Sequence, residues 1–170
     1  MRVHFALEPF PKSIFLAGPT PRGETTPSWR PEALRILKDE LVFTGTVLVP
    51  ETRDWAPHNE KNGQVHWEWE ALNQATVVAF WVPRNLENMP AFTTNIEFGM
   101  FANSGKMVLG YPPEAPKMLY LNNLAARYRI PTVFTLRGLL ELAVSAANQP
   151  FGGDFDAAKE HFTQPISPNP

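Results

Sequence analysis

A nearly continuous apolar segment in the middle of the chain, Thr76–Val82 (TVVAFWV), most constrains the fold. It ends at Pro83, and proline is excluded from the interior of a central strand because it has no N–H to donate. An apolar run without polar alternation is typical of a strand that is buried on both faces, as in parallel sheets covered by helices. The segment therefore predicts a central strand of a parallel sheet.

Shorter apolar runs that end near glycine or proline predict the neighbouring strands. These strands are expected at Ser13–Ala17, Thr46–Val49, Lys106–Gly110 and Pro131–Thr135. Segments with helical spacing of apolar residues alternate with them, at Pro31–Phe43, Gln64–Gln74, Thr94–Asn103, Lys117–Arg129 and Leu136–Asn148. This alternation predicts an α/β fold with a doubly wound, mostly parallel sheet and helices on both faces.

The composition is that of one globular domain, with 44% apolar and 19% charged residues in a chain of 170. We expect a single domain over residues 1–148 and a proline-rich tail over residues 149–170. The absence of cysteine excludes disulfides, thiolate catalysis and cysteine-ligated metals. A net charge of −2 without a basic block argues against a nucleic-acid polymer as a partner.

The sequence pattern gives no signal for a membrane or for secretion. No apolar run approaches the roughly 20 residues of a membrane span, and the first residues lack the apolar core and cleavage site of a signal peptide. We therefore expect a cytoplasmic protein without a membrane partner. The 12% aromatic content and the proline-rich tail indicate more apolar surface than one small domain hides, which predicts a homo-oligomer.

Ligands of parallel α/β folds bind outside the carboxyl ends of the strands, which here are followed by residues 18–29, 50–63 and 83–94. In the first of these loops Gly18 and Pro19 allow a close approach of the backbone to a ligand, and Thr20 and Arg22 offer donors. A tight turn with a surface arginine is the alternative. The loop has no glycine-rich fingerprint for dinucleotides or nucleoside triphosphates.

The tryptophans divide into two groups by their position. Trp69 and Trp81 follow core-like patterns, whereas Trp29 and Trp55 lie in the predicted ligand loops, where an indole ring can stack on a base. The histidines have no paired ligand spacing, so no metal site is expected; they are His4, His58, His66 and His161.

Thr94 and Glu97 have the spacing of a capping box, in which each side chain satisfies a backbone N–H at the start of a helix. Alternatively, Glu97 faces the ligand crevice as a nucleophile, with the N–H groups of the helix stabilising its ionised form. Spacing alone leaves both interpretations open.

A second carboxylate lies on the preceding helix. A helical wheel over Gln64–Ala75 places Val65, Trp69 and Leu72 on one stripe, with Glu68 beside it and Glu70 nearly opposite. Glu70 is expected to be a solvated charge. A carboxylate at the edge of the buried stripe is costly unless it is partnered or functional, so Glu68 is either in a structural ion pair or in a site.

Several short motifs, in order, resemble the nucleoside 2-deoxyribosyltransferase family over roughly residues 12–147. They are Ile14–Pro19 (IFLAGP), Val49–Glu51 (VPE), Trp67–Glu70 (WEWE) before Ala75–Val78 (ATVV), and Asn95–Gly99 (NIEFG). The resemblance is closest to a divergent branch with an F-W-x-P strand end and a T-x-x-E-F-G motif.

The resemblance implies a flavodoxin-like sheet, a homo-oligomer, and a glutamate nucleophile that attacks the anomeric carbon of a 2′-deoxynucleoside. Glu97 matches the nucleophile, and Glu68 matches a second carboxylate by its place eight residues before Thr76. Three positions depart from the family pattern: Glu68 is usually aspartate, Thr76 replaces an acidic residue, and Ala91 stands where an aspartate is often found.

The sequence therefore predicts an enzyme that transfers a deoxyribosyl group between bases, with a nucleoside or nucleotide and a free nucleobase as small-molecule partners and no cofactor. Glu97 and Glu68 are the expected catalytic residues. The expected substrate contacts are Gly18, Pro19, Thr20, Arg22, Trp29, Thr94 and Asn95. One alternative is an N-glycoside hydrolase of nucleoside 5′-monophosphates, with Arg22, Arg30 and Thr20 around the phosphate. The other is a binding module that holds a nucleotide-like ligand without turnover.

Overall fold

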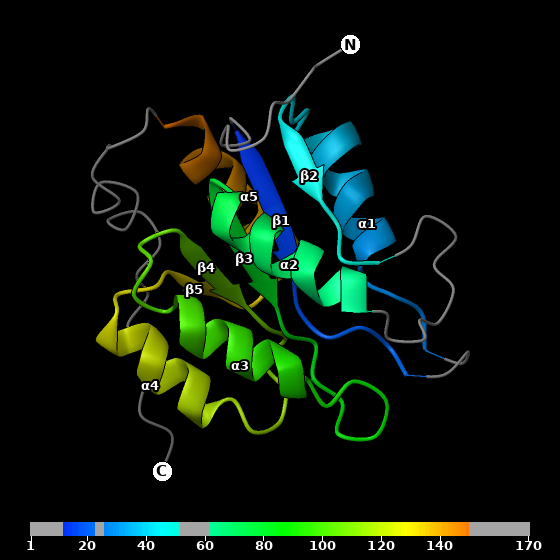
Figure 1. The fold of residues 1–170 in the computed structure, drawn as a ribbon, viewed down its shortest axis with the longest axis vertical. Helices are drawn as coiled ribbons and strands as arrows, with labels where there is room; N and C mark the ends of the chain where they lie inside the picture. Colours follow the sequence, from blue (N-terminus) through cyan, green and yellow to red (C-terminus); the bar gives the residue numbers. More distant parts are fainter. Residues whose placement is uncertain (1–11, 23–25, 52–61, 150–170) are drawn as a thin grey trace.

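The computed structural model describes residues 12–22, 26–51 and 62–149. Within these residues, five strands form one parallel sheet in the order β2-β1-β3-β4-β5 (Figure 1). They are β1 (Ser13–Ala17), β2 (Thr46–Leu48), β3 (Val77–Trp81), β4 (Met107–Gly110) and β5 (Thr132–Val133). The sequence predicted each of these strands to within two residues at either end.

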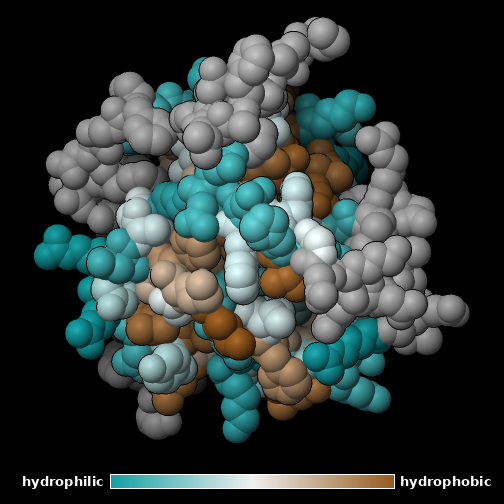
Figure 2. Space-filling model, in the orientation of Figure 1, coloured by the Kyte–Doolittle hydropathy of each residue, from teal (hydrophilic) through white to brown (hydrophobic). Residues whose placement is uncertain are grey.

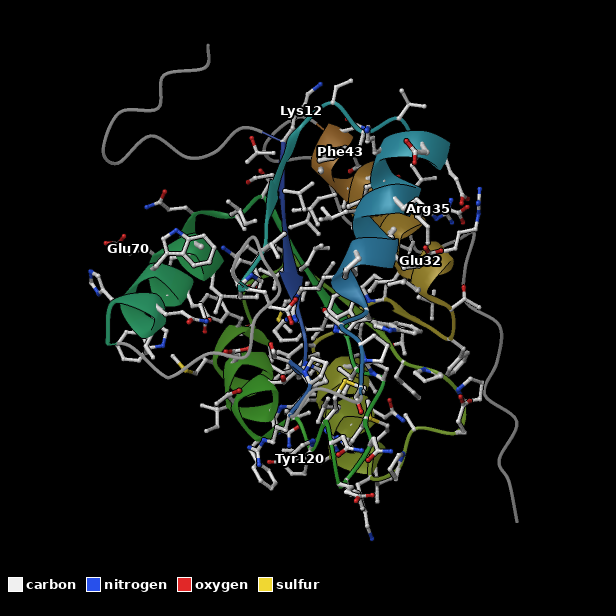
Figure 3. The ribbon with its side chains drawn as sticks, turned by 90° about the vertical axis from the view of Figure 1, so that its right-hand side faces the viewer. Lys12, Glu32, Arg35, Phe43, Glu70 and Tyr120 are labelled. Carbon is white, nitrogen blue, oxygen red and sulfur yellow. The ribbon has the colours of Figure 1, made fainter. Side chains whose placement is uncertain are left out.

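Helices cover both faces of the sheet. They are α1 (Arg30–Arg35), continued by the π-helical turn η1 (Ile36–Glu40), α2 (Asn62–Gln74), α3 (Phe92–Phe101), α4 (Leu119–Arg127) and α5 (Leu136–Asn148). One face packs on α1, η1 and α5, and the other on α2, α3 and α4. Figure 3 shows α2, with Glu70 on its outer side, and α1, with Glu32 and Arg35, on opposite sides of the sheet. This strand order and layering confirm the predicted flavodoxin-like α/β fold.

The central strand β3 is buried at every position, which is why its sequence shows no polar alternation. Val78 and Phe80 belong to the core under α2, α3 and α4. Val77, Ala79 and Trp81 belong to the core under α1 and α5. The predicted burial of Trp81 is confirmed.

Ser13 and Thr76 fix the register of β1 against β3. The N–H of Ser13 donates to Thr76 Oγ1 at 3.1 Å, and the N–H of Thr76 donates to Ser13 Oγ at 3.0 Å. Both residues lie at the amino ends of their strands, opposite to the ends where ligands bind. Thr76, which stands in place of an acidic residue of the family pattern, therefore has a structural role.

One expectation about the helices is wrong, and one helix is shifted by two residues. Trp69 is 53% exposed, because the buried side of α2 is formed by Ala71 and Leu72. The helix predicted from Thr94 begins at Phe92, two residues earlier. Its N-cap is Ala91, in the left-handed conformation with φ +63° and without a side-chain cap, so the sequence carried no capping signal for this start.

Several predictions fall outside the described residues. These are the tail beyond residue 149, Trp55, and the histidines His4, His58 and His161. Among the helices that the structure describes, none has the length and apolar character to cross a bilayer.

Candidate active site

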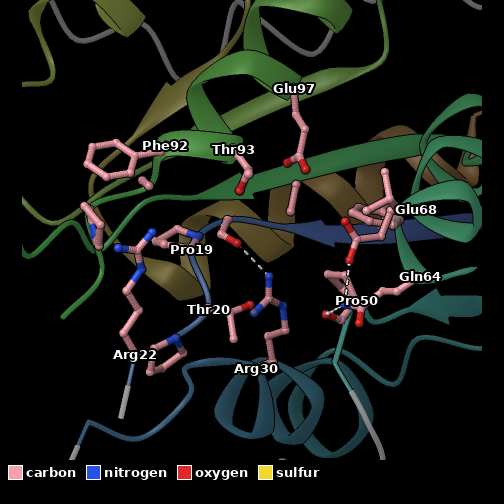
Figure 4. A pocket seen from close by; sticks show the side chains of 17 residues that line it. Pro19, Thr20, Arg22, Arg30, Pro50, Gln64, Glu68, Phe92, Thr93 and Glu97 are labelled. Carbon is pink, nitrogen blue, oxygen red and sulfur yellow. Dashed lines mark hydrogen bonds between the residues drawn. The ribbon is translucent and has the colours of Figure 1, made fainter. Parts of the chain in front are cut away.

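A pocket of about 410 Å³ opens at the carboxyl end of the sheet, beside β1 and the start of α3 (Figure 4). In the strand order 2-1-3-4-5, β1 and β3 are neighbours whose connections leave in opposite directions, so the pocket lies at the topological switch point. Its volume lies in the range of small-molecule sites. The described residues that line it come from the ends of β1 and β2, from α1, and from the starts of α2 and α3.

The loop after β1 forms one wall of the pocket, as predicted. Gly18, Pro19, Thr20 and Arg22 all line it. Gly18 has φ +144°, and a Cβ there would lie 2.0 Å from the carbonyl oxygen of Trp81. Only glycine fits this position, so the backbone of the loop can pass directly over the end of β3.

Trp29 does not line the pocket. Its indole is buried in the core under α1 and α5, and its Nε1 donates to the carbonyl of Pro19 at 3.2 Å. The ring therefore supports the loop from behind instead of offering a face for base stacking.

Glu97 reaches the pocket from the second turn of α3, one turn after Thr93, which also lines it (Figure 4). The capping-box interpretation of Thr94 and Glu97 is wrong, because the helix starts at Phe92 and neither residue caps it. Beyond the first turn, backbone N–H groups are bonded within the helix. Glu97 thus lies one turn beyond the free N–H groups of the helix start, and stabilisation of its ionised form by those groups stays a prediction.

Glu68 enters the same pocket from α2, so the two predicted carboxylates and Gly18 converge on one crevice. Glu68 Oε1 accepts a hydrogen bond from Gln64 Nε2 at 2.8 Å, and the same amide group reaches the carbonyl of Pro50 at 3.5 Å. Gln64 also lines the pocket. The i,i+4 spacing of glutamine and glutamate was the signal in the sequence for this pair.

The electrostatics of the pocket act most strongly on Glu97. Burial and the nearby charge of Glu68 raise the pKa of Glu97 to about 7, and the positive charge of Arg30 partly opposes this rise. A carboxyl group with a pKa near neutrality is typical of sites where a carboxylate takes part in chemistry. Near pH 7 Glu97 exchanges readily between its protonated and ionised forms.

Thr94 and Asn95 do not line the pocket. Thr94 is buried in the body of the protein. The side-chain oxygen of Asn95 accepts a hydrogen bond from Nη2 of Arg84, whose Nη1 donates to the carbonyl of Lys117. Arg84 thus joins Asn95 of α3 to the loop before α4.

Aromatic and apolar side chains that the sequence did not predict as substrate contacts complete the pocket. Phe92 stands at its rim, where the guanidinium of Arg22 lies 5.3 Å from the ring centroid. The backbone N–H of Arg22 donates to the carbonyl of Asn88, so the loop after β1 is joined to the loop after β3. The remaining members of this group are Phe15, Ala17, Pro21, Pro50, Val65, Pro90 and Ala91.

Arg30 is the buried cation of the site. Its guanidinium forms an ion pair with Glu51 at 3.1 Å and lines the pocket between the loop after β1 and the two carboxylates. In the described part of the chain, no group of three or more histidine, aspartate and glutamate side chains could hold a metal ion.

A family model described as nucleoside 2-deoxyribosyltransferase-like matches residues 11–115, which is more than half of the chain. This match contains the loop after β1, Arg30, Glu51, Glu68 and Glu97. The curated proteins yield no significant match to the sequence.

Proposed function

Because the chain belongs to the nucleoside 2-deoxyribosyltransferase-like family, we propose that it cleaves the N-glycosidic bond of a 2′-deoxynucleoside and transfers the sugar to another base. The observation that carries this proposal is the convergence of Glu97 and Glu68 on one pocket, together with a pKa of about 7 for Glu97. The pocket has the size for one nucleoside.

In the first step, a carboxylate oxygen of ionised Glu97 forms a bond to the anomeric carbon. The bond from this carbon to the base nitrogen breaks, and its electron pair leaves with the base, which takes up a proton. The sugar passes through a cation-like transition state that the negative carboxylates stabilise. A second base then attacks the glycosyl-glutamate, loses a proton and releases Glu97, so the difficult displacement is divided into two easier ones.

Glu68 positions the sugar or the base, and it assists the proton transfer to the leaving base. Its hydrogen bond from Gln64 orients the carboxyl group toward the pocket. The apolar rim around Phe92 and the prolines provides a surface for a flat base, and it limits the access of water. Exclusion of water favours transfer to a base over hydrolysis.

A second candidate function is hydrolysis of a nucleoside 5′-monophosphate, and Arg22 is the observation that favours it. Its guanidinium is exposed at the rim of the pocket, and it forms no ion pair with the residues that the structure describes. Arg30, in contrast, is occupied by Glu51 and by carbonyl groups. Of the two arginines considered from the sequence as phosphate contacts, Arg22 is the one whose guanidinium forms no ion pair with the described residues.

A non-catalytic binding module ranks below both enzymes. Its main support was the capping role of Glu97, and the structure removes that role. A half-buried carboxyl with no capping task that points into a pocket favours chemistry over passive binding.

We also propose that the protein is a homo-oligomer. Phe92, Ile96 and Met100 follow one another at i,i+4 spacing along α3, and each is more than 60% exposed. Figure 2 shows hydrophobic residues at the surface over this part of the molecule. An apolar stripe on a surface helix is typical of an interface.

The proposal is tested by incubating the protein with a panel of 2′-deoxynucleosides and nucleoside 5′-monophosphates, with and without a free acceptor base, followed by chromatography. We expect a new deoxynucleoside that requires the acceptor. Release of base from monophosphates alone, without any need for an acceptor, would favour the hydrolase. If no substrate releases its base under either condition, both proposed reactions are wrong.

A further inference from the structure

Arg30 is the most completely buried charged side chain that the structure describes, with 1% of its surface exposed. It is the first residue of α1, and its side chain passes under the loop after β1. Nε donates to the carbonyl of Leu16 at 3.0 Å, Nη2 to the carbonyl of Gly18 at 2.7 Å, and Nη1 to Thr20 Oγ1 at 3.2 Å. One side chain thus holds the end of β1 and two points of the loop that walls the pocket.

Glu51, which follows β2, is the fixed counter-ion of Arg30. The pair is 3.1 Å apart, and only 5% of the Glu51 side chain is exposed. The other oxygen of Glu51 accepts a hydrogen bond from Ser28 Oγ, and this hydroxyl oxygen accepts one from the N–H of Arg30. These contacts close a ring, which holds the guanidinium in one orientation.

The geometry of this ring is specific for arginine. Three acceptors and a carboxylate surround a planar group with five N–H donors, and the guanidinium also lies over the Trp29 ring at 4.7 Å. A lysine retains the charge but has one nitrogen on a flexible stem. Because four of the five N–H donors of Arg30 are engaged within the protein, its main task is to organise the site.

Arg30 also acts on the carboxylates of the pocket through its charge. The groups that face this region are Glu68 from α2, Glu97 from α3, Glu51 after β2, and Arg22 from the loop after β1. Burial lowers the pKa of Arg30, and the charges of Glu51, Glu68 and Glu97 counteract this change. In return, Arg30 opposes the rise in the pKa of Glu97.

We propose that Arg30, held by Glu51, is a positioning residue that fixes the loop after β1 over the substrate and supplies the buried positive charge of the pocket that Glu68 and Glu97 also line. The inference rests on the proposed function, because Glu97 is taken as the nucleophile. It goes further by assigning a task to an ion pair that does not itself take part in bond breaking.

The test compares Arg30→Lys with Arg30→Met. Lysine keeps the charge and loses the planar set of donors, so kcat/KM should fall about tenfold or more while the acidic limb of its pH profile stays in place. Methionine loses both, so the limb should move to higher pH in addition to the fall in rate. An acidic limb at the wild-type pH in folded Arg30→Met protein would overturn the electrostatic part, and unchanged kcat/KM in Arg30→Lys would overturn the positioning part.

A measurement that needs no activity separates this inference from the proposed function. The pH at which Glu97→Gln changes the free energy of unfolding reports the ionisation of Glu97 in the fold. We expect this pH to be higher in the Arg30→Met background than in the Arg30→Lys background, even if the reaction proves to be different. Equal values in the two backgrounds would contradict the inference and leave the proposed function untouched.

The Arg30→Met variant leaves Glu51 buried without its partner, which can prevent folding. The double variant Arg30→Met/Glu51→Gln removes this unpaired charge and replaces the single variant if it does not fold. Thr20→Val serves as the matched control: it removes one acceptor of Arg30 without changing any charge, so the limb of its pH profile should remain at the wild-type pH.

Discussion

Folding disfavours the ionised form of the Glu97 carboxyl group. Burial and the charge of Glu68 raise its pKa from 4.5 to about 7, so between these pH values the folded chain holds a proton that the unfolded chain releases. The stability of the fold therefore falls as the pH rises through this window. Residues that weaken a fold in this way are found at sites of chemistry.

Glu97→Gln should remove this pH dependence. We expect the variant to match the wild type near pH 4, where the carboxyl group is protonated in both states, and to exceed its free energy of unfolding by about 1–3 kcal/mol at pH 8. Urea unfolding of both proteins at the two pH values measures the difference. The control is Glu87→Gln, an exposed carboxylate that does not line the pocket. A constant difference between wild type and Glu97→Gln at all pH values would contradict a raised pKa.

Glu68→Gln should shift the pH profile of the reaction. Removing the like charge beside Glu97 lowers the pKa of Glu97, so the acidic limb of kcat/KM should move to lower pH, whatever the loss in the maximal rate. Glu70→Gln, on the outer side of α2 and beside His66, is the matched control and should leave the limb in place. A limb that stays at the wild-type pH in Glu68→Gln would show that the two carboxyl groups do not interact.

At the scale of the elements, α2 presents Glu68 to the pocket, and a lysine holds the end of this helix. Nζ of Lys106 donates to the carbonyls of Leu72 and Asn73 at 2.7 Å and of Ala75 at 3.2 Å. These carbonyls have no partners in the helix itself, because they lie in or beyond its last turn. The lysine thus joins the end of α2 to the start of β4.

Lys106→Met should destabilise the protein by about 1–2 kcal/mol, because the carbonyls at the end of α2 lose a charged donor while the apolar stem is retained. Denaturant unfolding compares it with Lys38→Met, an exposed lysine on η1. If Lys106→Met changes stability no more than Lys38→Met does, the lysine is not a significant cap of α2.

The elements also show what the sequence could and could not predict. Strands such as β3 were predictable because their apolar runs end at proline or glycine. The start of α3 was not, since Ala91 adopts φ +63° without a capping side chain. The helical wheel for α2 predicted that Trp69 is buried, but Ala71 and Leu72 form the buried side of the helix. Glu68 faces the pocket.

The candidate site also has residues that the sequence could predict and residues that it could not. Motifs and spacing predicted that Gly18, Glu68 and Glu97 lie at one crevice, and all three line the pocket. The central position of Arg30 was not predicted, because Leu16 and Gly18 bind it through backbone carbonyls, which every residue type has. Trp29 was expected to meet a base, yet its ring is needed to support Pro19.

At the scale of the whole molecule, the exposed stripe on α3 predicts the oligomer. Light scattering at micromolar concentration should give a mass above the 19.1 kDa of one chain. Ile96→Glu places a charge in the middle of the stripe and should shift the mass toward that of a monomer. Val42→Glu, which lies beyond η1 and away from α3, is the control. A monomer mass for the wild type would contradict the prediction.

The proposed mechanism depends on a covalent bond between Glu97 and the sugar. Intact-mass spectrometry of the protein mixed with a 2′-deoxynucleoside and no acceptor base measures this bond, and turnover with an acceptor base is followed in parallel. We predict that the wild type gains the mass of one deoxyribosyl group, which peptide mapping places on Glu97. Folded Glu97→Gln should gain no mass and lose turnover by about a thousand-fold or more. Near-normal turnover in Glu97→Gln, with no adduct on the wild type, would contradict the account.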